Sequence, residues 1–103
     1  MFVRVSRGRF AAEKYDEMAD RLKAAEEVLA PEIRAMPGLI DYYAGMDRDS
    51  NSMIRVSIWD RREHADAMSG LQHVSAKRDE FAAAGVEWEP VAIYNVSWWV
   101  QSP

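Results

Sequence analysis

The feature that most constrains the fold is a pair of alternating stretches at residues 38–46 and 51–59. In the second stretch Ile54, Val56 and Ile58 fall on one face of an extended chain, because successive side chains of a strand point to opposite sides. The polar sequence DRDS, rich in turn-forming residues, separates the two stretches. This pattern predicts a β-hairpin whose two faces carry different side chains.

A strand and a long helix are predicted ahead of the hairpin. Residues 2–9 alternate with the same period of two, which is typical of a strand. From Phe10 to about Ala30, apolar side chains recur three and four residues apart, the spacing of one helical face. That face consists of Ala11, Tyr15, Met18, Leu22, Ala25 and Leu29. Pro31 predicts a kinked extension of the helix that ends before Pro37.

A second helix and a last strand are predicted after the hairpin. Asp60 and Glu63 have the spacing of a capping box, so we expect this helix to begin at Arg61. Gly70 predicts a break within the helix, and Gly85 predicts its end. The sequence VAIYNVSWWV, which follows, predicts a final strand.

The predicted order of elements, βαββαβ, is typical of a ferredoxin-like α+β fold. A length of 103 residues suits one such domain, covering residues 1–103. In this fold two helices cover one face of a four-stranded antiparallel sheet and leave the other face bare. We expect a second copy of the chain to cover the bare face, which makes the protein a homodimer.

The two faces of the predicted sheet carry different side chains. We expect the helices to contact the aliphatic set, which is Val3, Val5, Ile54, Val56 and Ile58. The opposite face then carries Phe2, Arg4, Ser6, Met53, Arg55, Ser57, Trp59, Asn95, Ser97 and Trp99. This mixed set is too apolar for plain solvation and too polar for an ordinary core. It is therefore the predicted wall of a ligand cavity inside the dimer, with Trp98 and Trp99 close to the partner chain.

The composition excludes several classes of function. The chain has no cysteine, which rules out disulfides, thiolate metal sites and cysteine nucleophiles. Its net charge is −4, and its basic residues are scattered among acidic ones, so we expect no nucleic-acid partner. No apolar run is long enough to cross a membrane and no signal peptide is visible, so we expect a cytoplasmic protein without a membrane partner.

Four segments together resemble the antibiotic biosynthesis monooxygenase-like (ABM) family of dimeric α+β barrels. These segments are MPGLIDYY, VSIWDRREHADAM, LQHVSAKRDEF and YNVSWWV, and the resemblance covers nearly the whole chain. The resemblance implies the fold predicted above. Members of the family include cofactor-independent oxygenases of aromatic polyketides and haem-degrading monooxygenases, so it also implies one of these activities. Trp59 and His73 match residue types that the haem-degrading branch uses, but the first strand lacks the asparagine of that branch.

The candidate catalytic residues are Trp59, His73 and Asn95. Trp59 offers a flat surface on which an aromatic ligand can stack, or else it packs at the rim of the barrel. A histidine titrates near neutral pH, so His73 is a candidate proton acceptor if the break at Gly70 turns it toward the cavity. Asn95 is expected to polarise or anchor an oxygen atom. His64 is expected to be a solvated helix residue instead.

The candidate substrate-binding residues are Arg4, Arg55, Ser57, Trp59, Ser97 and Trp99. A buried arginine needs a carboxylate, a dimer partner or a ligand anion, and Asp41 is the alternative partner within the chain. His64 and His73 do not share a helical face, so no metal site is predicted. We also expect no cofactor.

Three functions are consistent with these residues. The first is cofactor-independent monooxygenation of a small aromatic or polyketide-like molecule in the barrel cavity. The alternative is a non-catalytic dimeric module for ligand binding or stress, and haem binding or degradation is a third reading. Oxygen uptake without added flavin or metal distinguishes the first function from the second.

Overall fold

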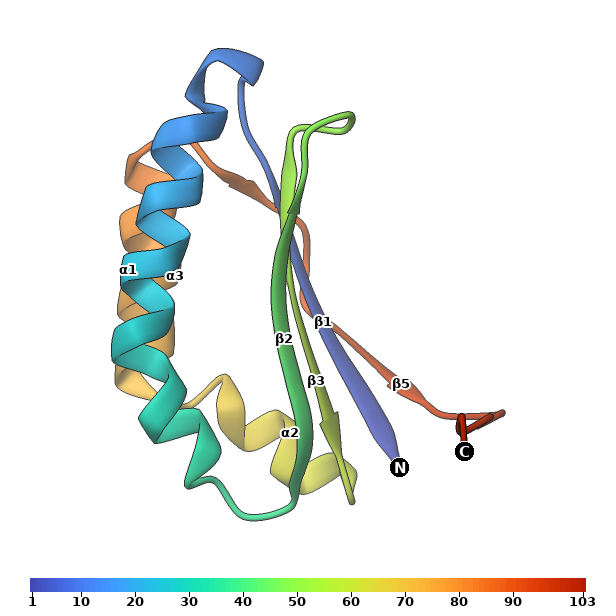
Figure 1. Cartoon of the computed structure of the whole chain (residues 1–103). Helices are drawn as coiled ribbons and strands as arrows, with labels where there is room; N and C mark the ends of the chain where they lie inside the picture. The colour runs from blue at the N-terminus through green and yellow to red at the C-terminus, as the bar shows by residue number, and fades with distance from the viewer.

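A layer of helices lies against one face of an antiparallel sheet (Figure 1). The structure is a computed structural model that describes residues 1–103. The elements in chain order are β1 (Phe2–Arg9), the 3-10 turn η1 (Ala12–Lys14), α1 (Tyr15–Arg34), β2 (Leu39–Asp47), β3 (Ser52–Trp59), α2 (Arg62–Met68), α3 (Gln72–Ala83), β4 (Glu87–Trp88) and β5 (Ala92–Asn95). The predicted α+β fold class, with its ferredoxin-like order, is confirmed.

The sheet has the order β2-β3-β1-β4, and β5 also pairs with β1. The predicted hairpin is confirmed, with Val56 of β3 paired to Tyr43 on one side and to Val5 on the other. The single last strand over residues 91–100 is wrong, because two short strands share the edge of β1. Pro90 lies between them and has no N–H to donate to a ladder.

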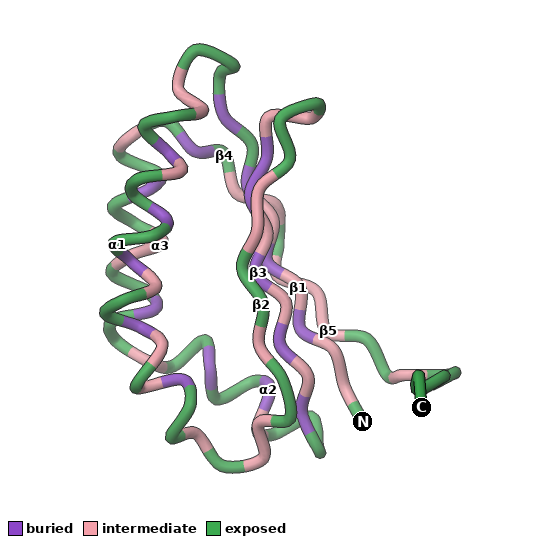
Figure 2. Tube along the Cα trace, viewed as in Figure 1, coloured by how far each residue is buried: buried purple, intermediate pink, exposed green.

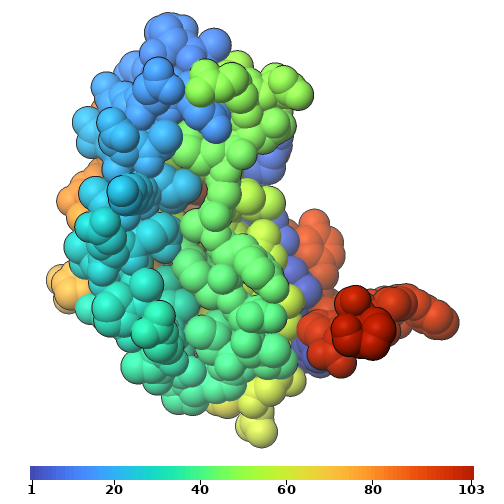
Figure 3. All heavy atoms as spheres, in the orientation of Figure 1, coloured from blue at the N-terminus to red at the C-terminus, as the bar shows by residue number.

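The last residues of the chain do not belong to the sheet. Strand β5 ends at Asn95, and the tail that follows projects away from the body of the molecule (Figure 3). Trp98 and Val100 are exposed by 84% and 82%. Ser97 and Trp99 are therefore not strand residues of a sheet face, contrary to the prediction.

The helices follow the sequence pattern in most respects. Helix α1 buries Met18, Leu22, Ala25, Leu29 and Ile33, and it continues past Pro31 to Arg34. The predicted break near Gly70 is confirmed, since it separates α2 from α3. None of the helices is both long enough and apolar enough to span a membrane.

The predicted capping box at the start of α2 is wrong. Arg61 occupies the N-cap position, and its side chain makes no capping hydrogen bond. The carboxylate of Asp60 instead contacts Nδ1 of His64 at 2.7 Å, one helical turn further on. This contact satisfies the carboxylate and leaves the helix start without a side-chain cap.

The assignment of the two sheet faces is also wrong, because the structure reverses them. Arg4, Arg55 and Trp59 are buried beneath the helices, whereas Val5 and Val56 lie half-exposed on the bare face. The alternation of buried and half-exposed residues along β1 and β3 is visible in Figure 2. The long side chains of Arg4, Arg55 and Trp59 lie between the sheet and the helices, and the short aliphatic ones lie on the bare face.

The interior holds two apolar clusters with polar side chains between them. The first cluster consists of Phe10, Met18, Leu22, Ala25, Met53, Phe81 and Val86. The second consists of Leu29, Ile33, Trp59, Ala65, Met68 and Val74. On β3, Arg55 and Ser57 lie between Met53 of the first cluster and Trp59 of the second. The core is therefore interrupted at its centre, which is unusual for a small domain.

Candidate functional site

The interrupted core forms a polar layer that is built from five elements, three strands and two helices. We define the polar layer as Arg4, Ser6, Glu26, Tyr42, Arg55, Ser57 and Arg78. Strand pairing places its sheet residues on one face, because Arg4 pairs with Ser57 and Ser6 pairs with Arg55. Tyr42 pairs with Ser57 from the other side. Helices α1 and α3 supply Glu26 and Arg78 from above the sheet.

Arg55 is held by the one carboxylate that forms an ion pair inside the layer. Its Nε donates to Oε1 of Glu26 at 2.9 Å, and the Arg55 side chain is 4% exposed. The hydroxyl of Tyr42 donates to the other carboxylate oxygen of Glu26 at 2.7 Å. Burial and then Glu26 raise the pKa of Tyr42, so its hydroxyl stays protonated and remains a donor. The predicted partner Asp41 is exposed and does not bind Arg55.

Arg4 has a single neutral hydrogen-bond partner. Its Nη2 donates to the hydroxyl of Ser69 at 3.0 Å, and its Nε is buried without a partner. Burial, followed by repulsion from Arg78 and Arg55, lowers the pKa of Arg4 to about 10. The direction of this change shows that the interior disfavours the cation.

Arg78 completes the layer from the α3 side. It donates to the hydroxyl of Ser6 at 2.8 Å and to the backbone carbonyl of Glu89 at 3.0 Å. Its guanidinium also lies over the ring of Trp88, 4.6 Å from the ring centre. Burial and then Arg55 lower the pKa of Arg78. None of its polar contacts supplies a negative charge.

Trp59 borders the polar layer and belongs to the second apolar cluster. It is fully buried, and its Nε1 donates to Oγ of Ser57 at 2.8 Å. The Ser57 hydroxyl in turn lies 3.6 Å from Sδ of Met68. Trp59 therefore has both the packing and the polar contact expected of a wall residue.

Other predicted site residues lie outside the polar layer. His73 is exposed at the start of α3, where its Nδ1 contacts Oε1 of Glu32 on α1 at 2.5 Å. Asn95 is exposed at the end of β5, and Ser97 and Trp99 lie in the exposed tail. The structure therefore brings together Arg4, Arg55, Ser57 and Trp59 of the predicted set, and it separates the remaining members from them.

The residues present do not fit a haem-degrading site. The first strand has no asparagine, and the imidazole of His73 is already bonded to Glu32 on the surface. No group of three or more histidine, cysteine, aspartate or glutamate residues is placed to hold a metal ion.

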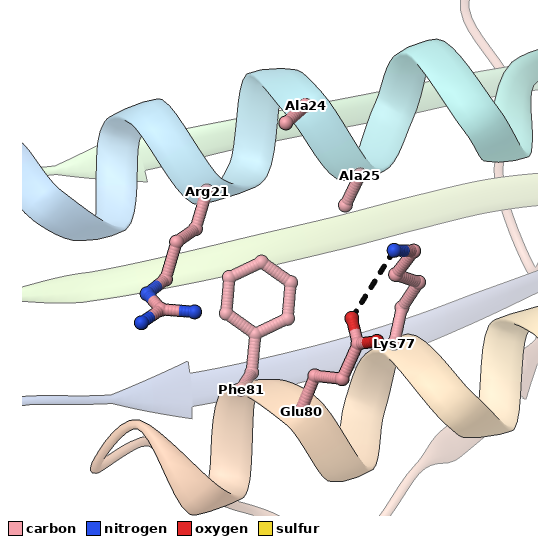
Figure 4. Close-up of a pocket in the computed structure, with 6 residues that line it drawn as sticks. All are labelled: Arg21, Ala24, Ala25, Lys77, Glu80 and Phe81. Carbon is pink, nitrogen blue, oxygen red and sulfur yellow. Dashed lines mark ion pairs between the residues drawn. The ribbon is translucent and has the colours of Figure 1, made fainter.

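A groove between α1 and α3 lies over this part of the interior (Figure 4). Its volume is about 190 Å³, and it is lined by Arg21, Ala24, Ala25, Lys77, Glu80 and Phe81. The Phe81 side chain points from α3 toward α1 (Figure 4) and is 3% exposed. Its ring centre lies 5.7 Å from Cζ of Arg55. Phe81 thus separates the groove from the polar layer.

Glu26, Tyr42 and Arg78 are members of the layer that the sequence reasoning missed. Glu26 follows Leu22 by four residues and precedes Leu29 by three, so it lies beside the apolar stripe of α1. That spacing was a usable signal for a carboxylate at the edge of the core. Arg78 has no such signal in the sequence, because its contact with Ser6 depends on how α3 packs on the sheet.

The fold is shared with solved structures named as antibiotic biosynthesis monooxygenases. One from Deinococcus radiodurans, provisionally so named, has a TM-score of 0.76 at 14% identity, over 100% of this chain and 99% of that one. A provisionally named protein from Nitrosomonas europaea has a TM-score of 0.70 at 18% identity, over 95% and 100% of the two chains. A variant of SnoaB, a cofactor-independent oxygenase from Streptomyces nogalater, has a TM-score of 0.64 at 13% identity, over 98% and 97%.

These comparisons establish the fold and not the chemistry of this chain. No protein-family model and no curated protein matches the sequence. At the identities found, a common fold can carry different activities, so function has to be argued from the polar layer.

Proposed function

We propose that the chain is a small cytoplasmic oxygenase that oxidises an aromatic or polyketide-like molecule without a cofactor. The observation that carries the proposal is the pair of buried arginines, Arg4 and Arg55, each with a donor nitrogen that lacks a partner. Polar groups are rarely left unsatisfied in a core unless they serve a ligand or a reaction. The fold shared with SnoaB, which is named a cofactor-independent oxygenase, supports this reading.

In the proposed reaction the substrate itself reduces dioxygen. A phenol or enol loses its proton, and the resulting anion forms a carbon–oxygen bond with dioxygen. Loss of water then leaves a carbonyl on the ring, so one oxygen atom enters the product and the other leaves in water. The protein has to bind the substrate, stabilise its negative charge and exclude bulk water.

The polar layer supplies groups for each of these tasks. Arg4 and Arg55 hold the substrate oxygens, Ser57 adds a hydroxyl, and Trp59 forms an apolar wall. Glu26 holds Arg55 and Tyr42 in position through its two carboxylate oxygens. The roles of His73 and Asn95 as proton acceptor and oxygen anchor stay predictions, as do substrate contacts from Ser97 and Trp99.

Oxygen consumption tests the proposal directly. A panel of quinol-type aromatic compounds is incubated with the protein in air, with a chelator and without flavin. We expect oxygen uptake above the rate of the uncatalysed oxidation, and loss of that uptake in Arg55→Met. Arg21→Met, which changes an exposed arginine paired with Glu17, is the matched control and should leave uptake unchanged. If no compound in the panel causes uptake, the chain is the non-catalytic binding module instead.

The same experiment decides the predicted role of His73. Its side chain is exposed and bonded to Glu32, so from its position we expect His73→Gln to retain oxygen uptake within about twofold. A loss of about a hundredfold would instead identify His73 as the proton acceptor.

We further propose that the active form is a homodimer joined through the bare sheet face. The apolar side chains of this outer face are Val3, Val5, Tyr43, Ile54, Val56, Ile58 and Tyr94, and Arg7 and Asp41 lie on the same face. Tyr43 and Tyr94 are 55% and 60% exposed in the single chain. A largely apolar face is expected to be covered by another surface, and a second copy of the same face can cover it through a two-fold contact.

A further inference from the structure

The outer face carries opposite charges at two opposite corners. Around Val56, strand pairing arranges the outer-face residues of three strands as a grid of three by three. Arg7 occupies the corner beside Ile54 on β1, and Asp41 occupies the corner beside Ile58 on β2, so Val56 lies midway between the two charges. The full grid is Val3, Val5 and Arg7 on β1, Ile54, Val56 and Ile58 on β3, and Asp41, Tyr43 and Gly45 on β2.

The two charges keep bonding capacity that their own chain does not use. Asp41 is exposed and forms no ion pair within the chain. Arg7 contacts Glu89 at 3.3 Å, and it does so through Nη1 only. A guanidinium has five N–H donors, so it can serve a second carboxylate. A contact through the outer face would remove water from both groups, and each then needs a partner of opposite charge.

The direction of the two-fold axis decides which residues of two copies face each other. An axis over Val56 that runs along the strands, or at right angles to them, places both charges against the partner's Val3 and the partner's Gly45. An axis along the line from Arg7 to Asp41 places each charge against its own copy, and like charges repel. An axis perpendicular to that line sets Arg7 against the partner's Asp41, and Asp41 against the partner's Arg7.

We infer that two copies of the chain meet about this last axis, so that Arg7 of each copy forms an ion pair with Asp41 of the partner subunit. The inference rests on the homodimer proposed above, and it adds the orientation of the copies and the residues that fix it. Two identical ion pairs then form, one on each side of Val56. A long arginine and a short aspartate together can span the about 10 Å that separates packed sheets.

The inferred orientation agrees with the way in which sheets pack. Residues on one face of a strand are about 6.8 Å apart and neighbouring strands are about 4.8 Å apart, so the line from Arg7 to Asp41 runs about 35° from the strands. The perpendicular axis therefore makes the strands of the two sheets cross at about 70°, which is close to the orthogonal class of sheet packing. Aligned packing, at about 30°, would leave both charges unpaired.

Charge reversal in separate chains tests the contact. Arg7→Glu and Asp41→Arg each place like charges opposite one another at both ion pairs of their homodimer, so we expect each to dimerise at least about tenfold more weakly than the wild type. In a mixed dimer of the two variants, the reversed residues face opposite charges, and the remaining Arg7 and Asp41 form the native pair. Native mass spectrometry of an equimolar mixture should show the mixed dimer as more than about nine tenths of all dimers.

A matched mixture controls for effects that do not involve the contact. Glu17 and Arg21 form an exposed ion pair on α1, on the helical side of the molecule. Dimers of Arg21→Glu and Glu17→Arg should pair at random, with the mixed dimer as about half of the total. Arg7→Glu also loses its contact with Glu89, but it does so in every dimer, so this loss cannot favour the mixed form.

Random pairing of Arg7→Glu with Asp41→Arg would overturn the inference, and a wild-type dimer would then leave the homodimer proposal intact. A monomeric wild type would overturn both, and oxygen uptake would still test the reaction separately.

Neutral variants serve if circular dichroism shows that a reversed chain does not fold. Arg7→Gln and Asp41→Asn remove the same ion pairs, so the double variant should dimerise as weakly as the weaker single variant. Losses of affinity that multiply in the double variant would overturn the inference.

Discussion

Arg4 carries a positive charge in the interior with only the Ser69 hydroxyl as a partner. Its lowered pKa, caused first by burial, means that the folded state disfavours the cation relative to the unfolded chain. Burial of the cation therefore costs stability at neutral pH, where Arg4 is protonated in both states, and this cost is relieved only as the pH rises above the lowered pKa of about 10. The molecule thus retains a residue that lowers its stability, which is typical of a binding or reactive site.

Replacing Arg4 should therefore stabilise the protein while impairing its site. We expect Arg4→Met to increase the free energy of unfolding by about 1 to 3 kcal/mol at pH 7, since an apolar side chain of similar length avoids the desolvation cost. Urea denaturation measures the change. Arg21→Met should remain within about 0.5 kcal/mol of the wild type, because its ion pair is exposed. A less stable Arg4→Met protein would show that Arg4 supports the fold.

Tyr42 makes the free energy of unfolding depend on pH in the alkaline range. The raised pKa of Tyr42 lies above the unfolded value of 10.0, so the unfolded chain loses this proton first. Its stabilising contribution is fully present below pH 10 and is lost as the pH rises above that value.

We expect Tyr42→Phe to cost about 1 to 3 kcal/mol at pH 8, through the lost hydrogen bond to the Glu26 carboxylate. The difference from the wild type should narrow above pH 10. Urea titrations of both proteins at several pH values give this comparison, and a difference that is constant with pH would mean that the hydroxyl does not sense Glu26.

At the scale of elements, the turn between α1 and β2, at residues 35–38, is hydrogen-bonded to the residue that follows β3. We call this turn the corner. Gly38 has a φ of 80°, and its carbonyl accepts from the backbone N–H of Asp60 at 3.0 Å. A Cβ at this position would collide with the side chains of Asp60 and His64. The corner therefore requires glycine both for its backbone conformation and for space.

We expect Gly38→Ala to lower the free energy of unfolding by about 1 to 3 kcal/mol, because it strains the corner that positions Trp59. Gly45→Ala is the matched control within β2, since its Cβ would meet nothing closer than Ile54 at 4.0 Å. That control should stay within about 0.5 kcal/mol of the wild type in thermal or urea unfolding. Equal losses in the two variants would contradict the role of the corner.

The sequence predicted most helices and strands correctly, but it did not predict which face of the sheet the helices cover. Periodicity located β1, β2, β3 and α1, because alternation and helical spacing are local properties. Periodicity cannot say which face of a strand meets the helices when both faces contain apolar residues. Val5 and Val56 were expected inside, yet the longer Trp59 and Arg55 reach the helices.

Only those residues of the candidate site that lie on the strands could be predicted from the sequence. Arg4, Arg55, Ser57 and Trp59 share a face by alternation alone, so the sequence could group them. Glu26 and Arg78 join them only through the packing of α1 and α3 on the sheet, which depends on contacts distant in sequence. His73 was expected near the cavity because of the break at Gly70, but its contact with Glu32 holds it on the outer side of the helices.

At the scale of the whole molecule, the bare sheet face should determine the state of association. Val56 lies at the centre of this outer face, paired with Val5 and Tyr43. We expect light scattering to give twice the monomer mass of 11.8 kDa for the wild type at micromolar concentration. Val56→Glu should give the monomer mass, since a buried unpaired carboxylate is costly in an apolar contact.

The control for this prediction uses another exposed valine. Val28 on α1 is 49% exposed and lies on the helical side of the molecule. Val28→Glu should keep the mass of the wild type. A wild-type protein that is already monomeric at micromolar concentration would refute the outer face as the dimer contact.

The placement of the tryptophans gives the molecule two separate optical signals. Trp59 is fully buried beside the polar layer, whereas Trp98 in the tail is 84% exposed. A neutral quencher dissolved in water reaches the tail and not the interior, so the fluorescence divides into an accessible and a protected fraction. Filling of the interior would alter the protected fraction, and contact of the tail with another chain would alter the accessible one. Occupancy and assembly can therefore be followed independently in one sample without an added label.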